Sequence, residues 1–377
     1  MKKKKPEIRF NGFEGEWEKD NAVYIFETYY DKNHPNLPVL SASQELGMVI
    51  RDNVGFQVQH NKENEVGYKR VLPGQFVIHL RSFQGGFAHS MVEGITSPAY
   101  TVMQFKKSSK QDDIYWKYVL TSKTFIKRLE TVTYGIRDGR SISFEDFSEL
   151  NFTFPTISEQ EKIGLFLTTL DKLIAKLEAK LDKLRKLKQA LLEKMFVNVN
   201  GWGKTPEIRF KGYTDKWEVK ELREVLITHP YKKHIGIIAN PARYPIIQQG
   251  NNPIMGLGSG LPYLDFKDKI IWGDHTTSVY RPTEPFLVAT DGIRILSIRN
   301  MNQMFLWNLI LYIKPIPKSY TRHFSMLVEK AISIPSIEEQ DKIGLSLTTL
   351  ENILSKTSTK LTKLRNIKQS LLQKMFA

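Results

Sequence analysis

The chain has 377 residues, with 55 Lys or Arg against 40 Asp or Glu, so its formal net charge is +15 and its pI is about 9.5. This length suffices for two or three domains, and the basic excess favours an anionic partner such as nucleic acid or a membrane surface. No cysteine is present, which excludes disulfides, thiolate zinc sites and a cysteine nucleophile and indicates a cytoplasmic protein.

The first residues carry a run of lysines, Lys2–Lys5, followed by PEIRFNGFEGEWE at Pro6–Glu18. Polar residues stand where a signal peptide needs an apolar segment, so we predict no export signal. The longest apolar run, Met304–Ile313, contains Asn308 and is about half as long as a bilayer span. We therefore expect no membrane-spanning helix.

The segments before each long helix have mixed periodicity. In the first half, Phe76–Leu80 and Tyr100–Phe105 have the composition of strands, whereas Asp112–Leu129 has a helical pattern. In the second half, Pro285–Ala289 predicts a strand and Met301–Ile313 predicts a helix. These patterns predict α+β modules.

Polar clusters in the first module suit contact with nucleic acid. They combine cations that bind phosphate, an amide that can read a base, and glycines that permit close backbone approach. Each cluster taken alone is more often an ordinary loop, so the assignment is a hypothesis from residue type. The candidate DNA contacts are Lys69, Arg70, Arg81, Gln84 and His89.

An amphipathic segment at Phe154–Phe196 follows the first module. Its apolar residues alternate at spacings of three and four, as in a coiled-coil seam, and only Lys188 interrupts the pattern. We predict a long helix that begins near Ser158, with Ser158 and Glu159 suited to the N-terminal dipole. An alternative is a short first helix with a break at Gly164.

Both the module entrance and the helical segment occur twice. PEIRF returns at Pro206–Phe210, offset by 200 residues, and the helical segment returns at Ile334–Phe376, offset by 180 residues, with most positions identical. The interiors of the two modules show little similarity. We predict globular modules at residues 1–153 and 206–333, a linker at 197–205, and helices at 154–196 and 334–377.

The seam positions are expected to pair the two helices with each other. Thr357 and Lys368 weaken the seam in the second copy. The predicted pairing residues are Leu170, Ile174, Leu177, Leu181, Leu184 and Leu191 in the first helix and Leu350, Leu354, Leu361, Leu364 and Leu371 in the second.

The repeats follow each other in a cyclic order. Phe196 ends the first helical copy shortly before Pro206, and Phe376 ends the second copy in a chain whose first PEIRF begins at Pro6. We therefore expect the termini to lie close together and the helices to run antiparallel about a pseudo-twofold axis. Parallel packing is an alternative, but it needs a module that carries the chain back over the full helix length.

The second module has its own amide-rich segment, QQGNN, and a polar segment, DHTT. Amide side chains can pair bidentately with adenine. The DHTT segment is either a hydrogen-bonded turn between Ile271 and Val279 or a contact loop. The candidate DNA contacts here are Gln248, Gln249, Asn251, His275, Thr276 and Arg281.

No segment of this sequence matches a catalytic or cofactor-binding motif well. Gly203-Lys204-Thr205 imitates the end of a phosphate-binding loop, but Asn198 stands where that motif requires glycine. The Asn-Pro-Pro-aromatic tetrad of amino-methyltransferases does not occur. His229 and His234 lack the spacing of a helical metal pair. We predict no catalytic residue and no metal site.

Taken together, the motifs resemble the specificity subunit of type I restriction-modification systems, over nearly the whole chain. The motifs are the PxxRFxGF opening with its tryptophan, RSFQGG at Arg81–Gly86, SPAY at Ser97–Tyr100, GDHT at Gly273–Thr276, RHF at Arg322–Phe324 and the repeated helical segment. The resemblance implies two target recognition domains, each reading one half of a bipartite sequence in double-stranded DNA. It also implies two antiparallel spacer helices, a coiled coil, whose length sets the gap between the half-sites.

The same resemblance implies that the chain is not itself an enzyme. Two methyltransferase subunits and further restriction subunits are expected to bind, and they would carry S-adenosylmethionine, ATP and Mg. We assign the flanking apolar positions of the helices to the methyltransferase subunits, namely Leu173, Leu187, Leu192, Ile353 and Ile367. The alternatives are a cryptic DNA methyltransferase or nuclease and a bivalent structural adaptor.

Overall fold

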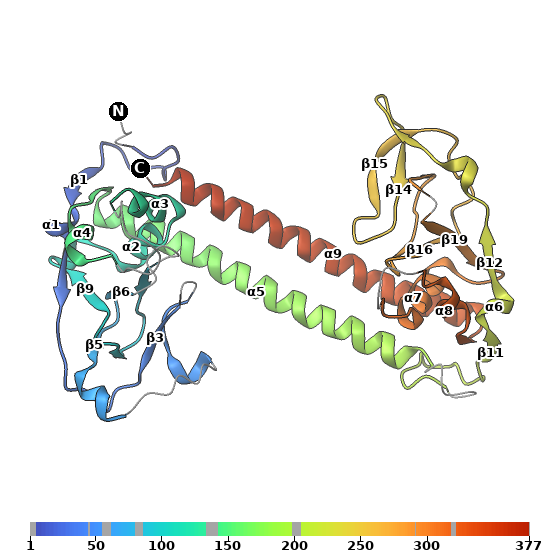
Figure 1. The fold of residues 1–377 in the computed structure, drawn as a ribbon, viewed down its shortest axis with the longest axis horizontal. Coiled ribbons are helices and arrows are strands. Elements are labelled where there is room, and N and C mark those ends of the chain that lie inside the picture. Colours follow the sequence, from blue (N-terminus) through green and yellow to red (C-terminus); the bar gives the residue numbers. More distant parts are fainter. Residues whose placement is uncertain are drawn as a thin grey trace. The chain divides into compact units, whose positions relative to one another are not determined.

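The computed structural model in Figure 1 describes residues 5–43, 46–54, 62–79, 86–132, 142–197, 205–290, 292–317 and 322–376. They form two compact units: unit 1 comprises Met1–Lys176 and Leu361–Ala377, and unit 2 comprises Leu177–Lys360. Each unit therefore contains one module and a portion of each long helix.

Unit 1 contains short strands and short helices. Its strands are β1 (Glu18–Asn21), β2 (Phe26–Tyr29), β3 (Leu40–Ser43), β4 (Gly47–Ile50), β5 (Lys69–Val71), β6 (Phe76–Ile78), β7 (Phe87–His89), β8 (Gly94–Thr96), β9 (Thr101–Phe105) and β10 (Asn151–Phe154). Its short helices are α1 (Ala22–Ile25), α2 (Asp113–Leu120), α3 (Lys123–Val132) and α4 (Phe144–Ser148). A four-stranded antiparallel sheet has the order β2-β9-β6-β7, and β1-β10, β3-β4 and β5-β8 form pairs.

An aromatic core joins this sheet to the helices of unit 1. Trp116 on α2 is fully buried and packs edge-on against Phe26 and Phe152, with ring centroids 5.1 Å away in both cases. Burial of side chains of this size contributes about 1.5–3 kcal/mol each. Ile163 and Met375, which come from the two long helices, belong to the same core. The module and both helices therefore form one packed body.

Unit 2 combines two larger sheets with one buried helix. Its strands are β11 (Glu218–Glu221), β12 (Leu226–His229), β13 (Ile237–Ile238), β14 (Tyr244–Ile247), β15 (Ile254–Ser259), β16 (Ile270–Gly273), β17 (Val279–Tyr280), β18 (Leu287–Val288), β19 (Ile293–Ile298) and β20 (Ala331–Ile334). Its short helices are α6 (Leu222–Val225), α7 (Gln303–Ile313) and α8 (Phe324–Val328). The sheet orders are β12-β19-β16-β17 and β13-β15-β14-β18, in which β14 and β18 run parallel, and β11 pairs with β20.

The core of unit 2 is built on α7. Phe305, Leu306 and Ile310 on this helix are fully buried in one cluster with residues of β16 and β19. Met195 and Leu347 from the two long helices join the same cluster. The second module therefore packs on helix ends in the same way as the first.

The two long helices are continuous. They are α5 (Ile157–Met195) and α9 (Ile337–Lys374). The helix runs through Gly164, so the alternative of a break there is wrong. A Cβ at Gly164 would lie 2.8 Å from Asp112 Oδ1, and one at Gly344 would lie 2.9 Å from the backbone N of Phe305. Each glycine therefore permits close packing against the N-terminus of a module helix.

Within each unit the long helices run antiparallel. In unit 1, Asp171 of α5 forms an ion pair with Lys368 of α9, whereas Ile163 lies in one core cluster with Met375. In unit 2, Lys188 forms an ion pair with Glu351, and further along α5, Leu192 shares a cluster with Ile343. The predicted seam residues are all buried or half-buried. The lysines that interrupt the seam therefore supply the charged contacts between the helices.

A buried ion pair fixes the entrance of each module to the start of a long helix. Arg9 donates two hydrogen bonds of 2.7 Å to Glu159, and Arg209 donates bonds of 2.7 and 2.8 Å to Glu339. We expected Ser158 to cap the helix and Glu159 to lie in its first turn. The helix α5 begins at Ile157, so Ser158 is not the cap, whereas Glu159 does lie in the first turn. Glu159 and Glu339 also bind the arginine of a PEIRF segment.

The termini lie together in unit 1, as the cyclic order predicts. The backbone N–H groups of Glu7 and Ile8 donate to the carbonyl oxygen of Lys374 at 2.9 and 3.1 Å. In unit 2, Ile208 donates in the same way to Lys194 at 2.9 Å. Both units therefore close the end of a long helix with the same PEIRF segment.

Candidate nucleic-acid interface

Two polar turns of unit 2 meet at one end of its sheets. The turn after β14 contains Gln249 and Gly250, and the turn after β16 contains His275 and Ser278. Gln249 Oε1 accepts a hydrogen bond from the backbone N of His275 at 3.1 Å, and the N–H of Gly250 donates to Ser278 Oγ at 2.8 Å. We call residues 248–252 and 274–278 the loop cluster.

Gly273 makes this close approach of the turns feasible. A Cβ at Gly273 would lie 2.4 Å from Ser278 Oγ, 2.6 Å from Thr276 Oγ1 and 2.7 Å from Gln249 Cβ. Contacts this short do not occur between real atoms, so a side chain at this position would push the two turns apart. The glycine of the GDHT motif is therefore a packing requirement of the loop cluster.

A buried carboxylate anchors the loop cluster to the rest of unit 2. Asp274 Oδ1 accepts from the backbone N of Phe324 at 3.0 Å, and Oδ2 accepts from Arg294 at 3.2 Å. Its carbonyl oxygen accepts from the backbone N of His323 at 2.9 Å. The guanidinium of Arg294 also lies 4.2 Å from the ring centroid of Phe324. The GDHT and RHF motifs thus meet, a contact between distant segments that residue types alone did not reveal.

Five of the candidate DNA contacts come together in the loop cluster. Asn251 and Thr276 are exposed, and the amide of Gln248 donates to the carbonyl oxygen of Asn252 at 2.9 Å. Gln249 and His275 are half-buried and hold the two turns together. The exposed side chains are therefore carried on a backbone that the half-buried ones fix.

Arg281 lies outside the loop cluster. It comes directly after β17, and its guanidinium lies 5.6 Å from the ring centroid of Trp307 on α7. Burial lowers the pKa of Arg281. The guanidinium therefore lies over an aromatic ring of the module and not beside the exposed side chains of the loop cluster.

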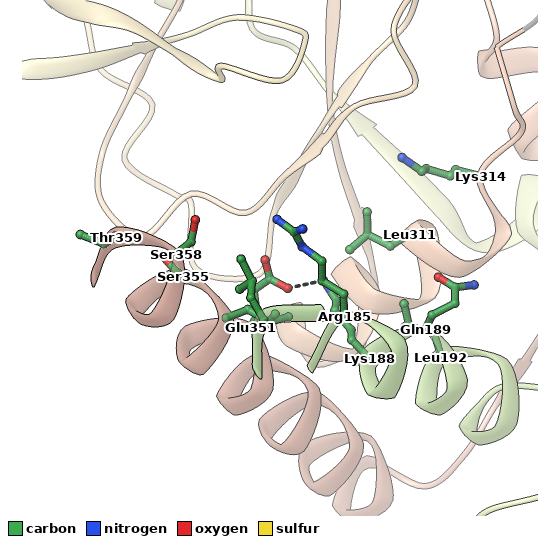
Figure 2. Close-up of a pocket in the computed structure, with 12 residues that line it drawn as sticks. Arg185, Lys188, Gln189, Leu192, Leu311, Lys314, Glu351, Ser355, Ser358 and Thr359 are labelled. Atoms are coloured by element: carbon green, nitrogen blue, oxygen red, sulfur yellow. Dashed lines mark hydrogen bonds and ion pairs between the residues drawn. The ribbon is translucent and has the colours of Figure 1, made fainter. Parts of the chain in front are cut away.

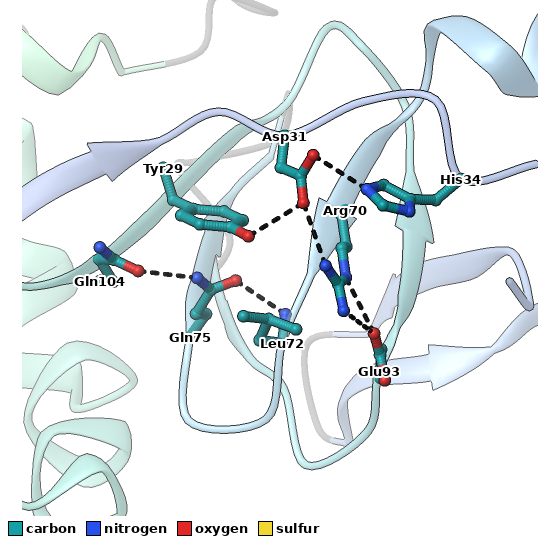
Figure 3. A network of polar contacts seen from close by, with 8 residues as sticks. All are labelled: Tyr29, Asp31, His34, Arg70, Leu72, Gln75, Glu93 and Gln104. Carbon is teal, nitrogen blue, oxygen red and sulfur yellow. Dashed lines mark hydrogen bonds and ion pairs between the residues drawn. The ribbon is translucent and has the colours of Figure 1, made fainter.

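Two basic candidates of unit 1, Lys69 and Arg70, make contacts within the module, and Figure 3 shows those of Arg70. Arg70 donates to Glu93 at 2.5 Å and to Asp31 at 3.2 Å, so two carboxylates compensate its charge. Lys69 donates to the carbonyl oxygen of Tyr100 at 2.6 Å, and burial lowers its pKa. Hydrogen bonds from His34, first, and then from Arg70 lower the pKa of Asp31. Arg70 is thus a structural residue in this unit, and the ammonium group of Lys69 is bound to a backbone carbonyl oxygen.

His89 is a correction to the candidate list. Its side chain is almost fully buried, and the residue as a whole is 3% exposed. Its Nε2 lies 2.7 Å from Asp113 Oδ2, and its ring packs on Phe76. A buried imidazole with these partners does not reach DNA. Arg81 and Gln84 lie outside the described residues.

The contact between His89 and Asp113 predicts a pH dependence of stability. The hydrogen bond from His89 lowers the pKa of Asp113 below its ordinary value of 3.8. A depressed folded-state pKa stabilises the fold above the ordinary value, and this contribution is lost as the pH falls through the folded-state value. We expect Asp113→Asn to be less stable than the unaltered chain at neutral pH and to lose less stability below about pH 4. Denaturant unfolding at several pH values measures this. If the free energy of unfolding changed with pH in the same way for both proteins, the prediction would be contradicted.

The outward positions of the long helices differ in exposure. Leu173, Leu187, Ile353 and Ile367 are 40, 48, 41 and 50% exposed, as their assignment to a partner surface requires. Leu192 is 8% exposed and belongs to the core of unit 2. Its assignment as an outward residue is therefore wrong, because this side of the helix already packs on the module.

The part of the chain that the structure describes contains neither a cluster of metal-ligating residues nor a membrane-spanning helix. No group of three or more His, Cys, Asp or Glu residues in that part could hold a metal ion. Among the same residues, no helix is long and apolar enough to cross a membrane.

Comparisons with known proteins bear on both units. A family model described as the type I restriction modification DNA specificity domain matches residues 23–186 and again 214–366. The fold is similar to a crystal structure of the S subunit of a type I restriction-modification system from M. genitalium, with a TM-score of 0.65, 16% identity and 99% of both chains covered. A structure from work on complex assembly and conformational transition of the type I R-M system has a TM-score of 0.50 and 13% identity, with 96% and 97% covered. No curated protein matches.

Proposed function

Because the chain belongs to the type I restriction-modification DNA specificity family, we propose that it selects the DNA sequence on which a larger complex acts. The observation that carries this proposal is the double family match, since each match spans most of one module and of the long helix that follows it. One chain therefore has two DNA-reading modules, which suits a target made of two half-sites.

The two modules have different reading surfaces on similar frames. The entrance ion pairs and the long helices repeat, whereas the interior strand orders differ, with a parallel pair only in unit 2 among the described strands. Repeated frames favour equivalent placement on DNA, and different interiors favour two unlike half-sites. We assign the loop cluster to base reading in unit 2, because it carries the exposed Asn251 and Thr276.

Asn251 provides a direct test of this assignment. If its amide reads a base edge, Asn251→Ala should reduce discrimination at one base pair by about 1–3 kcal/mol, or roughly 5- to 150-fold. Methylation mapping on a randomised DNA library with the assembled complex measures this. The half-site read by unit 1 serves as the internal control. An unchanged preference at every position of both half-sites would remove Asn251 from the reading surface.

We propose that the exposed apolar positions of the long helices bind two methyltransferase subunits, one at each helical copy. Leu187 and Ile367 occupy equivalent positions and are about half exposed. Replacing both with Asp should weaken subunit assembly at least tenfold, since each substitution would bury an unpaired carboxylate in the interface, with little loss of folding stability. Size-exclusion chromatography and denaturant unfolding measure the two effects. Lys186→Asp on the exposed side of α5 is the matched control. Normal assembly of the double variant would refute the assignment.

The proposal places the chemistry on the partners. We propose that S-adenosylmethionine, ATP and Mg bind to methyltransferase and restriction subunits, that this chain is not catalytic, and that the complex acts on cytoplasmic double-stranded DNA. The experiment is methylation mapping with the assembled complex, beside the purified chain alone. We expect adenine methylation at a bipartite site only from the complex. Methylation or cleavage by the chain alone would favour an enzyme, and a complex that methylates without this chain's DNA contacts would favour a structural adaptor.

A further inference from the structure

Unit 2 contains a cationic pocket where the two long helices meet the end of α7 (Figure 2). It has a volume of about 590 Å³. Three cations line it, Arg185 and Lys188 from α5 and Lys314 from the end of α7, against one carboxylate, Glu351 of α9. Gln189 and the hydroxyl groups of Ser355, Ser358 and Thr359 complete the polar lining.

Unit 1 contains an equivalent pocket of about 400 Å³. It is lined by Arg365 and Lys368 of α9, by Lys123 of α3 and by one carboxylate, Asp171 of α5. Three hydroxyl-bearing residues of its module line it as well, namely Thr121, Ser122 and Thr124. Each unit thus has a pocket with three cations, one carboxylate and several hydroxyl groups, built from equivalent segments of the two helices.

Several pocket residues are identical at equivalent positions of the two helical copies. Arg185, Lys188 and Gln189 return unchanged as Arg365, Lys368 and Gln369, whereas Lys186 returns as Asn366. At about 100° per residue, the three kept side chains of α5 lie within an arc of about 100°, and Lys186 lies outside it. The ion pairs with Glu351 and Asp171 explain why the lysines are kept. They do not explain Arg185, which has no ion-pair partner among the described residues.

Two cations of the unit 2 pocket, Lys188 and Lys314, lie near enough to interact electrostatically. Burial and, second, the charge of Lys188 lower the pKa of Lys314. Like charges in proximity repel one another, so one bound anion would relieve this repulsion.

One residue that lines the pocket contacts the loop cluster. Lys314 Nζ lies 3.5 Å from the carbonyl oxygen of Thr277, which belongs to the turn that carries His275 and Thr276. Trp307 donates from Nε1 to the carbonyl oxygen of Val279 at 3.4 Å, directly after that turn. A DNA strand that contacts the loop cluster would therefore pass near Lys314, one of the three cations of the pocket.

We propose that each pocket binds a phosphate of the DNA backbone next to the half-site that its own unit reads. In unit 2, Arg185, Lys188 and Lys314 hold the phosphate, and the hydroxyl groups of α9 donate to its oxygens. The contact is independent of sequence and fixes the register of the module on DNA. This inference rests on the proposed function of the chain as a DNA-reading subunit.

The test uses the assembled complex with Arg185→Gln and Lys314→Gln, alone and together. Loss of one phosphate contact lowers the slope of log affinity against log salt by about 0.9. We expect that reduction in the double variant, an affinity about tenfold lower, and unchanged half-site sequences. Lys186→Gln removes a charge from the neighbouring position of α5 outside the pocket, so it should leave both the slope and the affinity unchanged.

Phosphate ethylation interference gives a second readout that locates the contact. In the unaltered complex, ethylation of one phosphate beside each half-site should reduce binding. In the double variant, ethylation of the phosphate beside the half-site of unit 2 should no longer reduce binding. Ethylation of the phosphate beside the half-site of unit 1 should still reduce it. Arg365→Gln should abolish the effect of ethylation beside the half-site of unit 1 and leave the effect beside the half-site of unit 2 unchanged.

The outcomes separate this inference from the proposed function. An unchanged salt slope in a fully assembled variant complex would overturn the phosphate site while the sequence specificity stands. Loss of subunit assembly with an unchanged slope would overturn it as well, because the pocket would then bind a carboxylate of a partner subunit. If the unaltered complex has no sequence preference, the proposed function itself fails. Arg185→Gln alone changes an exposed side chain, so it tests the site even if the double variant does not fold.

Discussion

Four residues added to each long helix should lengthen the gap between the two DNA half-sites by about one or two base pairs. The insertions belong between Lys176 and Leu177 in α5 and between Lys360 and Leu361 in α9, because the two units divide at these points. Four helical residues add about 6 Å, against about 3.4 Å per base pair along one DNA strand. The spacer helices, and not the modules, would then set the gap.

Contacts within each unit survive these insertions. The ion pair between Asp171 and Lys368 lies in unit 1, and that between Lys188 and Glu351 lies in unit 2. The reading surfaces therefore stay unchanged, although the added helix rotates by about 40°, which DNA twist must absorb.

Methylation of a DNA library measures the outcome. Methylation of the original target should fall about 100-fold, in the range of one or two mismatched base pairs, while a target with the longer gap gains activity. Four residues added to the linker at 197–205 are the control and should leave the gap unchanged. An active insertion complex with the original gap would show that the helices do not set it, and altered half-sites would show that they contribute to base reading.

Glu339→Ala should destabilise the protein by about 3–5 kcal/mol, the usual cost of removing one partner from a buried ion pair. Glu339 is 1% exposed and accepts two hydrogen bonds from Arg209 and one from Trp217 Nε1 at 3.1 Å. The substitution leaves a guanidinium and an indole N–H without their acceptor in the interior. A loss of this size raises the ratio of unfolded to folded protein by about 150- to 5,000-fold.

Denaturant unfolding measures this loss, and the sequence offers matched controls. Glu338→Ala removes the same charge from the exposed neighbouring position, so it should change stability by less than about 0.5 kcal/mol. In unit 1, Glu159→Ala with the control Glu161→Ala repeats the comparison around Arg9. If Glu339→Ala behaved like Glu338→Ala, the ion pair would not hold the module entrance in place.

Periodicity and repetition predicted the frame of the protein well. The spacing of three and four along Phe154–Phe196 predicted a long helix, and α5 occupies Ile157–Met195. The cyclic order of PEIRF and helix predicted neighbouring termini, which the bonds from Glu7 and Ile8 to Lys374 confirm. These features depend on local spacing and on sequence order, and both are visible in a single sequence.

Contacts between distant segments could not be predicted in the same way. The helical pattern at Asp112–Leu129 is two helices, because Ser122 accepts from the backbone N of Phe125 at 3.1 Å at the start of α3. His89 has the residue type of a DNA contact. However, its imidazole forms a hydrogen bond with Asp113, which lies 24 positions further along the chain. Residue type shows what a side chain can do, whereas its neighbours in the fold determine whether it is free to do it.

Amide side chains in the loop cluster illustrate the same limit. Gln249 and Asn251 are two positions apart and equally suited to pair with adenine. The fold uses Gln249 to join two turns through His275 and leaves Asn251 exposed. The local pattern selected both residues, but it could not separate the one that joins the turns from the one that is exposed on them.

The composition of the two units has a consequence for synthesis on the ribosome. Unit 2 is one continuous stretch, Leu177–Lys360, whereas unit 1 also needs Leu361–Ala377, whose Met375 joins its core. The module made first is thus completed last. At about 5–20 residues per second, unit 1 waits on the order of 10–40 s for the C-terminal segment, whose Phe376 packs against the ring of Tyr115. Loss of the last helical turns would therefore damage the N-terminal module, and the nascent chain is most vulnerable to aggregation and proteolysis there.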